Sequence, residues 1–181
     1  MKYGIAIPED LERMLRSHLF QNELEQGAFL FAQPLRYRDE LWLEAVNVYL
    51  IKPSGWEVQL EVYLEMNDAE RAKIMKIAKD TNLAVIDCHS HPGSDEDVGF
   101  SPSDKRGITE FAAYAKWKLD GKPFTAMVWG ESSVDAVGWC DSFEKATKID
   151  VVKILGDSAR VLVPRGTWFH RIPSYRKKGY E

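Results

Sequence analysis

The sequence LAVIDCHSHP, residues 83–92, combines a predicted buried strand with two histidines at its end. The apolar residues 83–86 predict a buried strand that ends at His89. Side chains two residues apart on a strand point to the same side, so His89 and His91 are expected to face one point. Cys88 should point to the opposite face, where a buried structural thiol is expected.

The sequence SPSD, residues 101–104, follows after a loop and predicts the start of a helix. Ser101 is placed as the N-cap and Asp104 as the third helical residue, which together form a capping box. Proline is favoured at the first helical position, where Pro102 lies. An apolar stripe continues the helix at Ile108, Phe111, Ala112, Ala115 and Leu119. Asp104, in the first turn, can therefore face the two histidines.

Two imidazoles and one carboxylate form a ligand set that suits Zn²⁺, and three protein ligands leave the fourth tetrahedral position open for catalysis. The loop before Ser101 also carries Asp95, Glu96 and Asp97. We expect these three residues to be a solvated loop tip, with Asp95 or Asp97 as the alternative third ligand.

The pattern H-S-H-P, then a loop, then S-x-x-D, resembles the signature of the JAMM metalloproteases, the zinc-binding branch of the MPN/JAB domain family. The family's upstream E-x-x-G-x-x-L-G pattern is similar to residues 25–32, which begin with Glu25. The resemblance implies zinc ligands at His89, His91 and Asp104, a general acid/base at Glu25 and an oxyanion-stabilising hydroxyl at Ser101. The loop before Ser101 is longer than in the family, and Ala32 replaces the family's last glycine.

Glu23 lies two residues before Glu25 and would share its side of a strand, so it remains the alternative acid/base. The wider pattern predicts helices at residues 8–19 and 67–80. Strands are predicted at residues 27–32, 41–51, 58–65, 123–130 and 134–140. The first helix is expected to bury Leu11, Met14, Leu15 and His18. Strand-like residues 151–155 and 160–163 have no assigned place.

This order of elements supports the resemblance, which implies an α/β fold of layered α+β type: an MPN/JAB domain with a mixed, curved β-sheet flanked by helices and a cytidine-deaminase-like core. We predict one metalloprotease domain at residues 1–164 and a basic, aromatic tail at residues 165–181. The net charge of −4 argues against nucleic acid as a partner. No apolar stretch is long enough to span a membrane, and the start lacks a secretory signal, so we expect a cytoplasmic protein.

The resemblance, to short prokaryotic members in particular, implies a zinc-dependent isopeptidase or peptidase. Its substrate would be a ubiquitin-like protein or its conjugate, cleaved after the C-terminal tail. Homologues of ubiquitin-activating or ubiquitin-conjugating enzymes would be its operon partners, and residues 95–97 would meet basic residues of the substrate. The alternatives are a non-catalytic MPN scaffold and a hydrolase that processes sulfur-carrier proteins. A metallophosphoesterase is a weaker alternative, because its barrel needs about 250 residues.

Overall fold

A computed structural model describes residues 1–142 and 144–169 of the chain. Its helices are α1 (Glu9–Leu19), α2 (Asp68–Thr81) and α3 (Pro102–Lys118), with short 3-10 turns η1 (Pro53–Gly55) and η2 (Thr167–Phe169). Its strands are β1 (Lys2–Pro8), β2 (Gly27–Tyr37), β3 (Glu40–Leu50), β4 (Trp56–Gln59), β5 (Leu64–Met66), β6 (Ala84–Ser90), β7 (Phe124–Trp129), β8 (Val134–Trp139), β9 (Thr147–Lys148), β10 (Val151–Leu155) and β11 (Arg160–Leu162).

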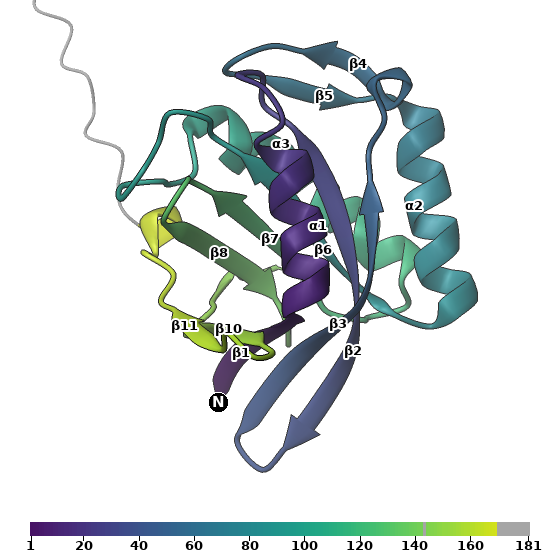
Figure 1. The fold of residues 1–181 in the computed structure, drawn as a ribbon. Coiled ribbons are helices and arrows are strands. Elements are labelled where there is room, and N and C mark those ends of the chain that lie inside the picture. Colours follow the sequence, from purple (N-terminus) through teal and green to yellow (C-terminus); the bar gives the residue numbers. More distant parts are fainter. Residues whose placement is uncertain (143, 170–181) are drawn as a thin grey trace, which may run out of the picture.

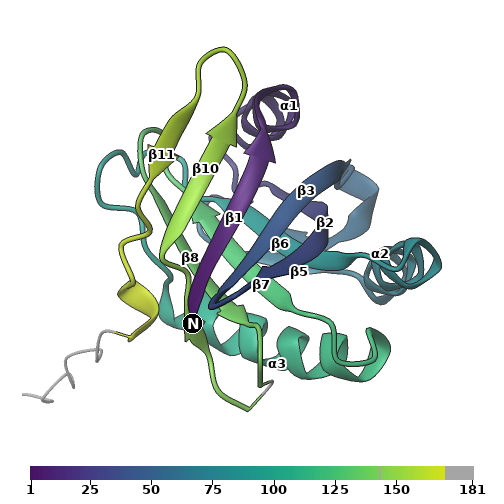
Figure 2. The same cartoon turned by 90° about the horizontal axis from the view of Figure 1, so that it is seen from below.

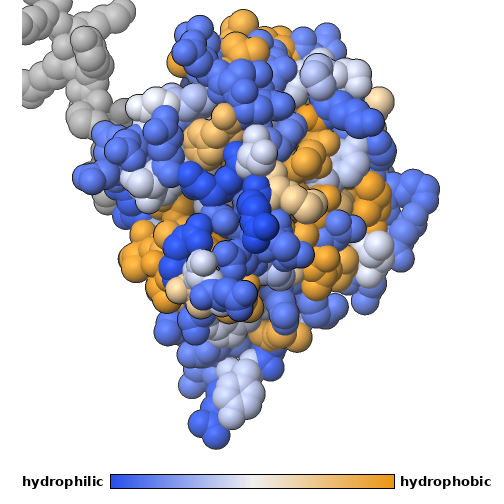
Figure 3. Space-filling model, viewed as in Figure 1, coloured by the Kyte–Doolittle hydropathy of each residue, from blue (hydrophilic) through white to orange (hydrophobic). Residues whose placement is uncertain are grey.

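Nine of the eleven described strands form one curled, mixed sheet in the order β11-β10-β1-β3-β2-β6-β7-β8-β9, and β4 and β5 form a separate two-stranded sheet (Figure 1). β1 runs parallel to β3 and β10, and β6 runs parallel to β7, while the other neighbouring strands are antiparallel. The far end of the β2–β3 hairpin projects at the bottom of Figure 1. Its tip carries hydrophilic side chains (Figure 3), which suits a strand end that extends into solvent.

Each face of the sheet covers its own hydrophobic core. α1 packs on one face through Leu15 and Leu19, and α2 and α3 pack on the other face. Figure 2 shows α1 and α3 on opposite sides of the strands. On β6, Ile86 and Cys88 belong to the α1 core while Val85 belongs to the α2–α3 core. His89 follows the alternation and therefore faces the side of α2 and α3.

Side-chain caps fix the starts of the two helices that cover the site. Asn67 accepts a hydrogen bond from the Glu70 amide at 2.9 Å and starts α2. Ser101 and Asp104 form the predicted capping box at the start of α3, with Pro102 as its first residue. The apolar stripe predicted for α3 is buried. The N-cap predicted at Ser101 is thus confirmed, and the helix predicted at residues 67–80 is α2.

The fold is the mixed α+β arrangement that the sequence predicted, but two local predictions were wrong and one strand was missed. Residues 58–65 were expected to be one half-buried strand. They instead form most of a separate β4–β5 hairpin, with Leu60 and Val62 more than half exposed. Met14 is exposed on α1, and Glu12 is buried instead, because Arg160 pairs with its carboxylate at 2.7 Å. The strand β1, parallel to β10, was not predicted.

The end of the described chain packs onto the domain. Gly166 and Thr167 donate main-chain hydrogen bonds to the buried carboxylate of Asp135, at 2.6 and 2.8 Å. Gly166, Thr167 and Trp168 of the predicted tail therefore pack on the domain, Arg165 and Phe169 are exposed, and residues 170–181 lie outside the described residues. Across residues 1–142 and 144–169, none of the helices has the length and apolar character that a membrane span requires.

Candidate metal centre

The two histidines of the motif lie where β6 reaches the edge of the sheet. His89 pairs with Gly27 of β2 on one side and with Val128 of β7 on the other. The main-chain amide of His91 donates to the Trp129 carbonyl at 2.9 Å, which continues the contact with β7 by one residue. Their positions therefore follow from main-chain hydrogen bonds to neighbouring strands, and both side chains reach the same point.

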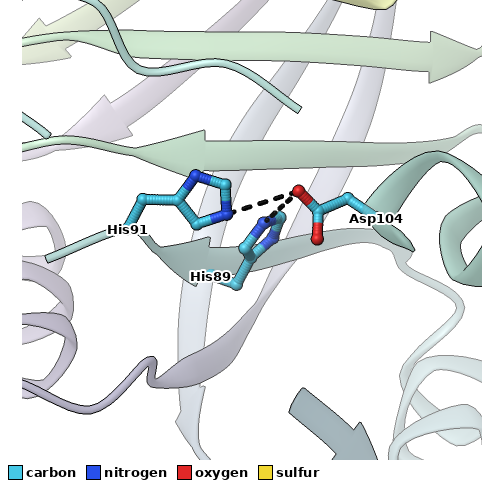
Figure 4. Close-up of side chains that lie close together, drawn as sticks. All are labelled: His89, His91 and Asp104. Carbon is cyan, nitrogen blue, oxygen red and sulfur yellow. Dashed lines mark ion pairs between the residues drawn. The ribbon is translucent and has the colours of Figure 1, made fainter. Parts of the chain in front are cut away.

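Asp104 reaches this point from the first turn of α3. Its Oδ2 accepts the Ser101 amide at 2.7 Å, and its own amide donates to the Ser101 hydroxyl at 3.1 Å. Both bonds of the capping box thus hold the carboxylate that faces the histidines. Figure 4 shows the imidazoles of His89 and His91 directed toward the Asp104 carboxylate.

The distances within the cluster suit a shared metal ion. Asp104 Oδ2 lies 3.5 Å from His89 Nε2 and 3.3 Å from His91 Nε2. One ligand atom from each of the three residues lies within 4.8 Å of the others. Ligands about 2.0–2.1 Å from a tetrahedral zinc ion would be roughly 3.3 Å apart. The cluster therefore needs only small side-chain shifts to hold such an ion.

His89 Nε2 gives a separate indication of a missing partner. It is buried and makes no hydrogen bond of good geometry among the described residues, although Asp104 Oδ2 lies 3.5 Å away. A buried polar atom without a partner is costly and rare in native structures. A metal ion between His89, His91 and Asp104 would satisfy this nitrogen, so the residues present fit the implied group.

Glu25 completes the cluster from the residues just before β2. Its side chain is 7% exposed, and Oε1 lies 3.4 Å from His91 Nε2. Burial raises the pKa of Glu25, and the nearby imidazoles of His89 and His91 offset part of that rise. A buried carboxyl with a raised pKa can exchange protons closer to neutral pH than a solvated one. This arrangement suits the acid/base role that the sequence predicted.

The hydroxyl of Ser101 lies next to the cluster and also caps the N-terminus of α3. Its Oγ accepts the Asp104 amide and lies 2.9 Å from Ser103 Oγ. Accepting that amide leaves the Ser101 hydroxyl proton available to another acceptor. The role of Ser101 in stabilising an oxyanion stays a prediction, and its role as N-cap is confirmed.

The alternatives to the predicted site residues lie away from the three ligand atoms. Asp95, Glu96 and Asp97 are exposed, and none belongs to the metal-compatible group found in the described chain. The Asp95 carboxylate accepts the Ser132 hydroxyl and the Asp95 carbonyl accepts the Ser133 hydroxyl, which fastens this loop to the β7–β8 turn. Glu23 is exposed and is not in a strand, so it does not share a strand face with Glu25.

Two residues that sequence reasoning missed hold the main chain around Glu25. The Ser90 hydroxyl accepts the Gln26 amide at 3.1 Å, and Gln59 donates to the Glu25 carbonyl at 3.0 Å. The amide of Glu25 donates to the Leu60 carbonyl at 3.1 Å. The alternation along β6 could have shown that Ser90, between the two histidines, points away from the cluster and toward neighbouring main chain. No sequence pattern indicated the contact made by Gln59 of β4.

A cavity of about 480 Å³ opens from the cluster between α3 and the β4–β5 hairpin. Glu25, His89 and Asp104 line one part of it, and Phe111 and Tyr114 of α3 line another. The candidate metal centre is therefore accessible to a ligand that is larger than water.

No protein-family model matches this chain, and no curated protein matches it. A solved structure with a similar fold is the solution structure of protein DSY2949 from Desulfitobacterium hafniense. The two chains are 15% identical, and the alignment covers 84% of this chain and 95% of that one, with a TM-score of 0.51. At this identity the similarity supports the mixed α+β fold alone.

Proposed function

We propose that this chain is a zinc-dependent isopeptidase or peptidase of the JAMM type, with an MPN/JAB fold. Its substrate is a ubiquitin-like protein or conjugate, cleaved after the C-terminal tail. One observation carries the proposal: Glu25 Oε1 lies 3.4 Å from His91 Nε2, within a cluster of His89, His91 and Asp104 that is compatible with a metal ion. An acid/base beside an open three-ligand site is what metal-assisted hydrolysis requires.

His89, His91 and Asp104 would hold the ion. A bound zinc ion supplies Lewis acidity and makes water a better nucleophile at neutral pH. Glu25 accepts a proton from the attacking water and passes it to the leaving amine, so the amide bond breaks without a covalent intermediate. A positioned acid/base contributes a factor of about 10²–10⁴ to the rate. Ser101, at the N-terminus of α3, donates a hydrogen bond from its hydroxyl to the carbonyl oxygen as negative charge develops there.

The cavity supports a peptide-like substrate. It lies between α3 and the β4–β5 hairpin, and residues from both elements line it. That hairpin forms a two-stranded sheet apart from the main sheet. An extended tail can add to a strand edge through main-chain hydrogen bonds, which give affinity with little dependence on sequence.

The test combines metal content with cleavage. The purified chain is stripped with a chelator, reloaded with zinc and incubated with a ubiquitin-like protein joined through its C-terminal tail to a second protein. We expect one zinc ion per chain and two fragments, whose new ends are read by mass spectrometry. Glu25→Gln should keep zinc, and its cleavage rate should fall by a factor of about 10²–10⁴. Glu23→Gln should keep both its zinc content and its cleavage rate.

Other outcomes distinguish the remaining functions. A chain that binds no stoichiometric zinc and cleaves nothing, yet still binds ubiquitin-like proteins, would be the non-catalytic scaffold. A zinc-loaded chain that cleaves only extended sulfur-carrier proteins would be the processing hydrolase. Full activity in Glu25→Gln would remove Glu25 from the mechanism.

A further inference from the structure

The cavity beside the candidate metal centre contains a carboxylate that the mechanism does not use. Asp87 lies two residues before His89 on β6, so both side chains point to the same side of the sheet. Both residues line the cavity. At a rise of about 3.3 Å per residue, Asp87 lies about 7 Å along the strand from His89. A group bound at Asp87 would thus be close to a bond undergoing hydrolysis at the cluster.

Asp87 is half-buried, and across residues 1–142 and 144–169 its carboxylate makes no hydrogen bond or ion pair. The nearby guanidinium of Arg71 has other partners. It pairs with Asp68 at 3.2 Å, donates to the Met66 carbonyl at 3.4 Å and lies over the Phe111 ring at 5.8 Å. Half-buried carboxylates are usually paired, so Asp87 offers a free acceptor for a cation.

The walls around Asp87 suit the stem of a long side chain. Phe29, Trp56, Met66, Ile108 and Phe111 supply apolar and aromatic surface to the cavity. Lysine places an ammonium group at the end of an aliphatic stem that packs along such surfaces. Beyond the residues of the cluster, the cavity is lined by carboxylates of Glu65, Asp87 and Glu110 and by guanidiniums of Arg71 and Arg106. These three carboxylates outnumber the two guanidiniums, so the surplus charge of this group is negative.

Three residues that line the cavity also have a buried nitrogen without a hydrogen-bond partner in the described chain: Trp56 Nε1, Arg71 Nε and His89 Nε2. These nitrogens are donors or metal ligands and are not exposed to solvent, so they do not compete with an ammonium group for the Asp87 carboxylate.

We propose that this cavity is a specificity subsite that binds a lysine side chain of the substrate next to the scissile bond, with Asp87 as the partner of its ammonium group. The assignment of the cavity as a substrate subsite rests on the proposed function. The binding itself does not depend on hydrolysis, because the ligand is recognised by the cavity and not by the metal.

The experiment uses two small probes, N-acetyl-lysine methylamide and N-acetyl-norleucine methylamide, which share a stem and differ in charge. Each is titrated into the zinc-loaded chain and followed by NMR chemical shifts. The lysine probe should bind about 10- to 100-fold more tightly than the norleucine probe, as expected for a hydrogen bond to a charged group. Asp87→Asn should remove that difference, and Asp39→Asn, an exposed carboxylate in the β2–β3 turn, should keep it.

A second variant covers the case in which Asp87→Asn does not fold. Gly107 lines the cavity from α3, and a Cβ added there meets nothing within 4 Å. Leucine favours a helix more than glycine does, so Gly107→Leu should fold and fill the cavity, and it should weaken binding of the lysine probe at least about 10-fold. Unchanged binding in Gly107→Leu would overturn the proposal.

The remaining outcomes separate this inference from the proposed function. Equal affinity for the two probes, or a charge preference that persists in Asp87→Asn, overturns the lysine subsite even if the chain cleaves ubiquitin-like substrates. An Asp87-dependent preference for lysine in a chain that shows no hydrolysis supports the subsite and counts against the proposed chemistry.

Discussion

The two sides of the candidate metal centre are built in different ways. On one side, His89 and His91 belong to the end of β6 and are placed by main-chain contacts to β2 and β7. On the other side, Asp104 is placed by particular side chains. The capping box with Ser101 holds its carboxylate. The C-terminal segment, residues 166–168, holds Phe100 just before the cap through the Thr167 hydroxyl.

That second support reaches far along the chain. The Thr167 hydroxyl accepts the Phe100 amide at 3.0 Å and also bonds the Asp135 carboxylate. The Lys105 ammonium, on α3, donates to the Thr167 carbonyl at 2.8 Å. The histidine side should therefore tolerate changes at distant side chains, whereas the Asp104 side should respond to them.

The largest effect is expected at the histidine side. His91→Ala should lower zinc affinity by more than about 100-fold, because even outer partners of a metal ligand contribute about 10- to 100-fold. The stability of the zinc-free chain should change little, since the strand pairing uses main-chain atoms. Zinc is measured by competition with a coloured chelator. His18→Ala is the control, because His18 bonds the Gly27 carbonyl at 3.1 Å outside the three-residue cluster. Full zinc affinity in His91→Ala would remove it from the ligand set.

Removal of Asp104 should combine two losses. Asp104→Ala should lose stoichiometric zinc and also destabilise the zinc-free chain by about 1 kcal/mol, because half of the capping box disappears. Asp95→Ala and Asp97→Ala, in the exposed loop, should retain zinc. Zinc content and thermal melts of the stripped proteins measure both quantities. If Asp104→Ala keeps zinc and Asp97→Ala loses it, the third ligand comes from the loop.

The buried carboxylate of Asp135 allows a test of the distant support. It accepts four hydrogen bonds, from the Ala136, Gly166 and Thr167 amides and from the Thr167 hydroxyl. Asp135→Asn exchanges one acceptor oxygen for an NH₂ group and should cost about 1–3 kcal/mol of unfolding free energy. Zinc affinity should fall about 10-fold, at the weak end of the range for outer partners.

The matched control for Asp135→Asn is Asp150→Asn. Asp150 accepts the Tyr3 amide at 2.8 Å, so its loss should cost stability without changing zinc affinity. Equal zinc affinity in both variants would mean that the C-terminal segment stabilises the fold without positioning Asp104.

The same contrast explains what the sequence could predict. The histidines, the capping box and the burial of α3 follow from spacings of two to four residues, and such local patterns are readable in one sequence. Asp135 and Thr167 are 32 residues apart and carry no pattern that joins them. The β4–β5 hairpin was missed for a related reason. Its alternating residues follow a strand period, but they do not pack in the main sheet, and Val62 is 79% exposed.

The smallest effect on stability is expected for Ser101→Ala, which also tests whether Ser101 acts only as a helix cap or stabilises an oxyanion as well. Ser101→Ala removes the acceptor for the Asp104 amide and should cost about 1 kcal/mol, which shifts the melting temperature by about 2–4 °C in a domain of this size. Asn67→Ala removes the equivalent cap of α2 and should cost a similar amount. If Ser101 also stabilises the oxyanion, kcat should fall about 10²–10³-fold in Ser101→Ala alone. Equal kcat in the two variants, at equal loss of stability, would limit Ser101 to the helix cap.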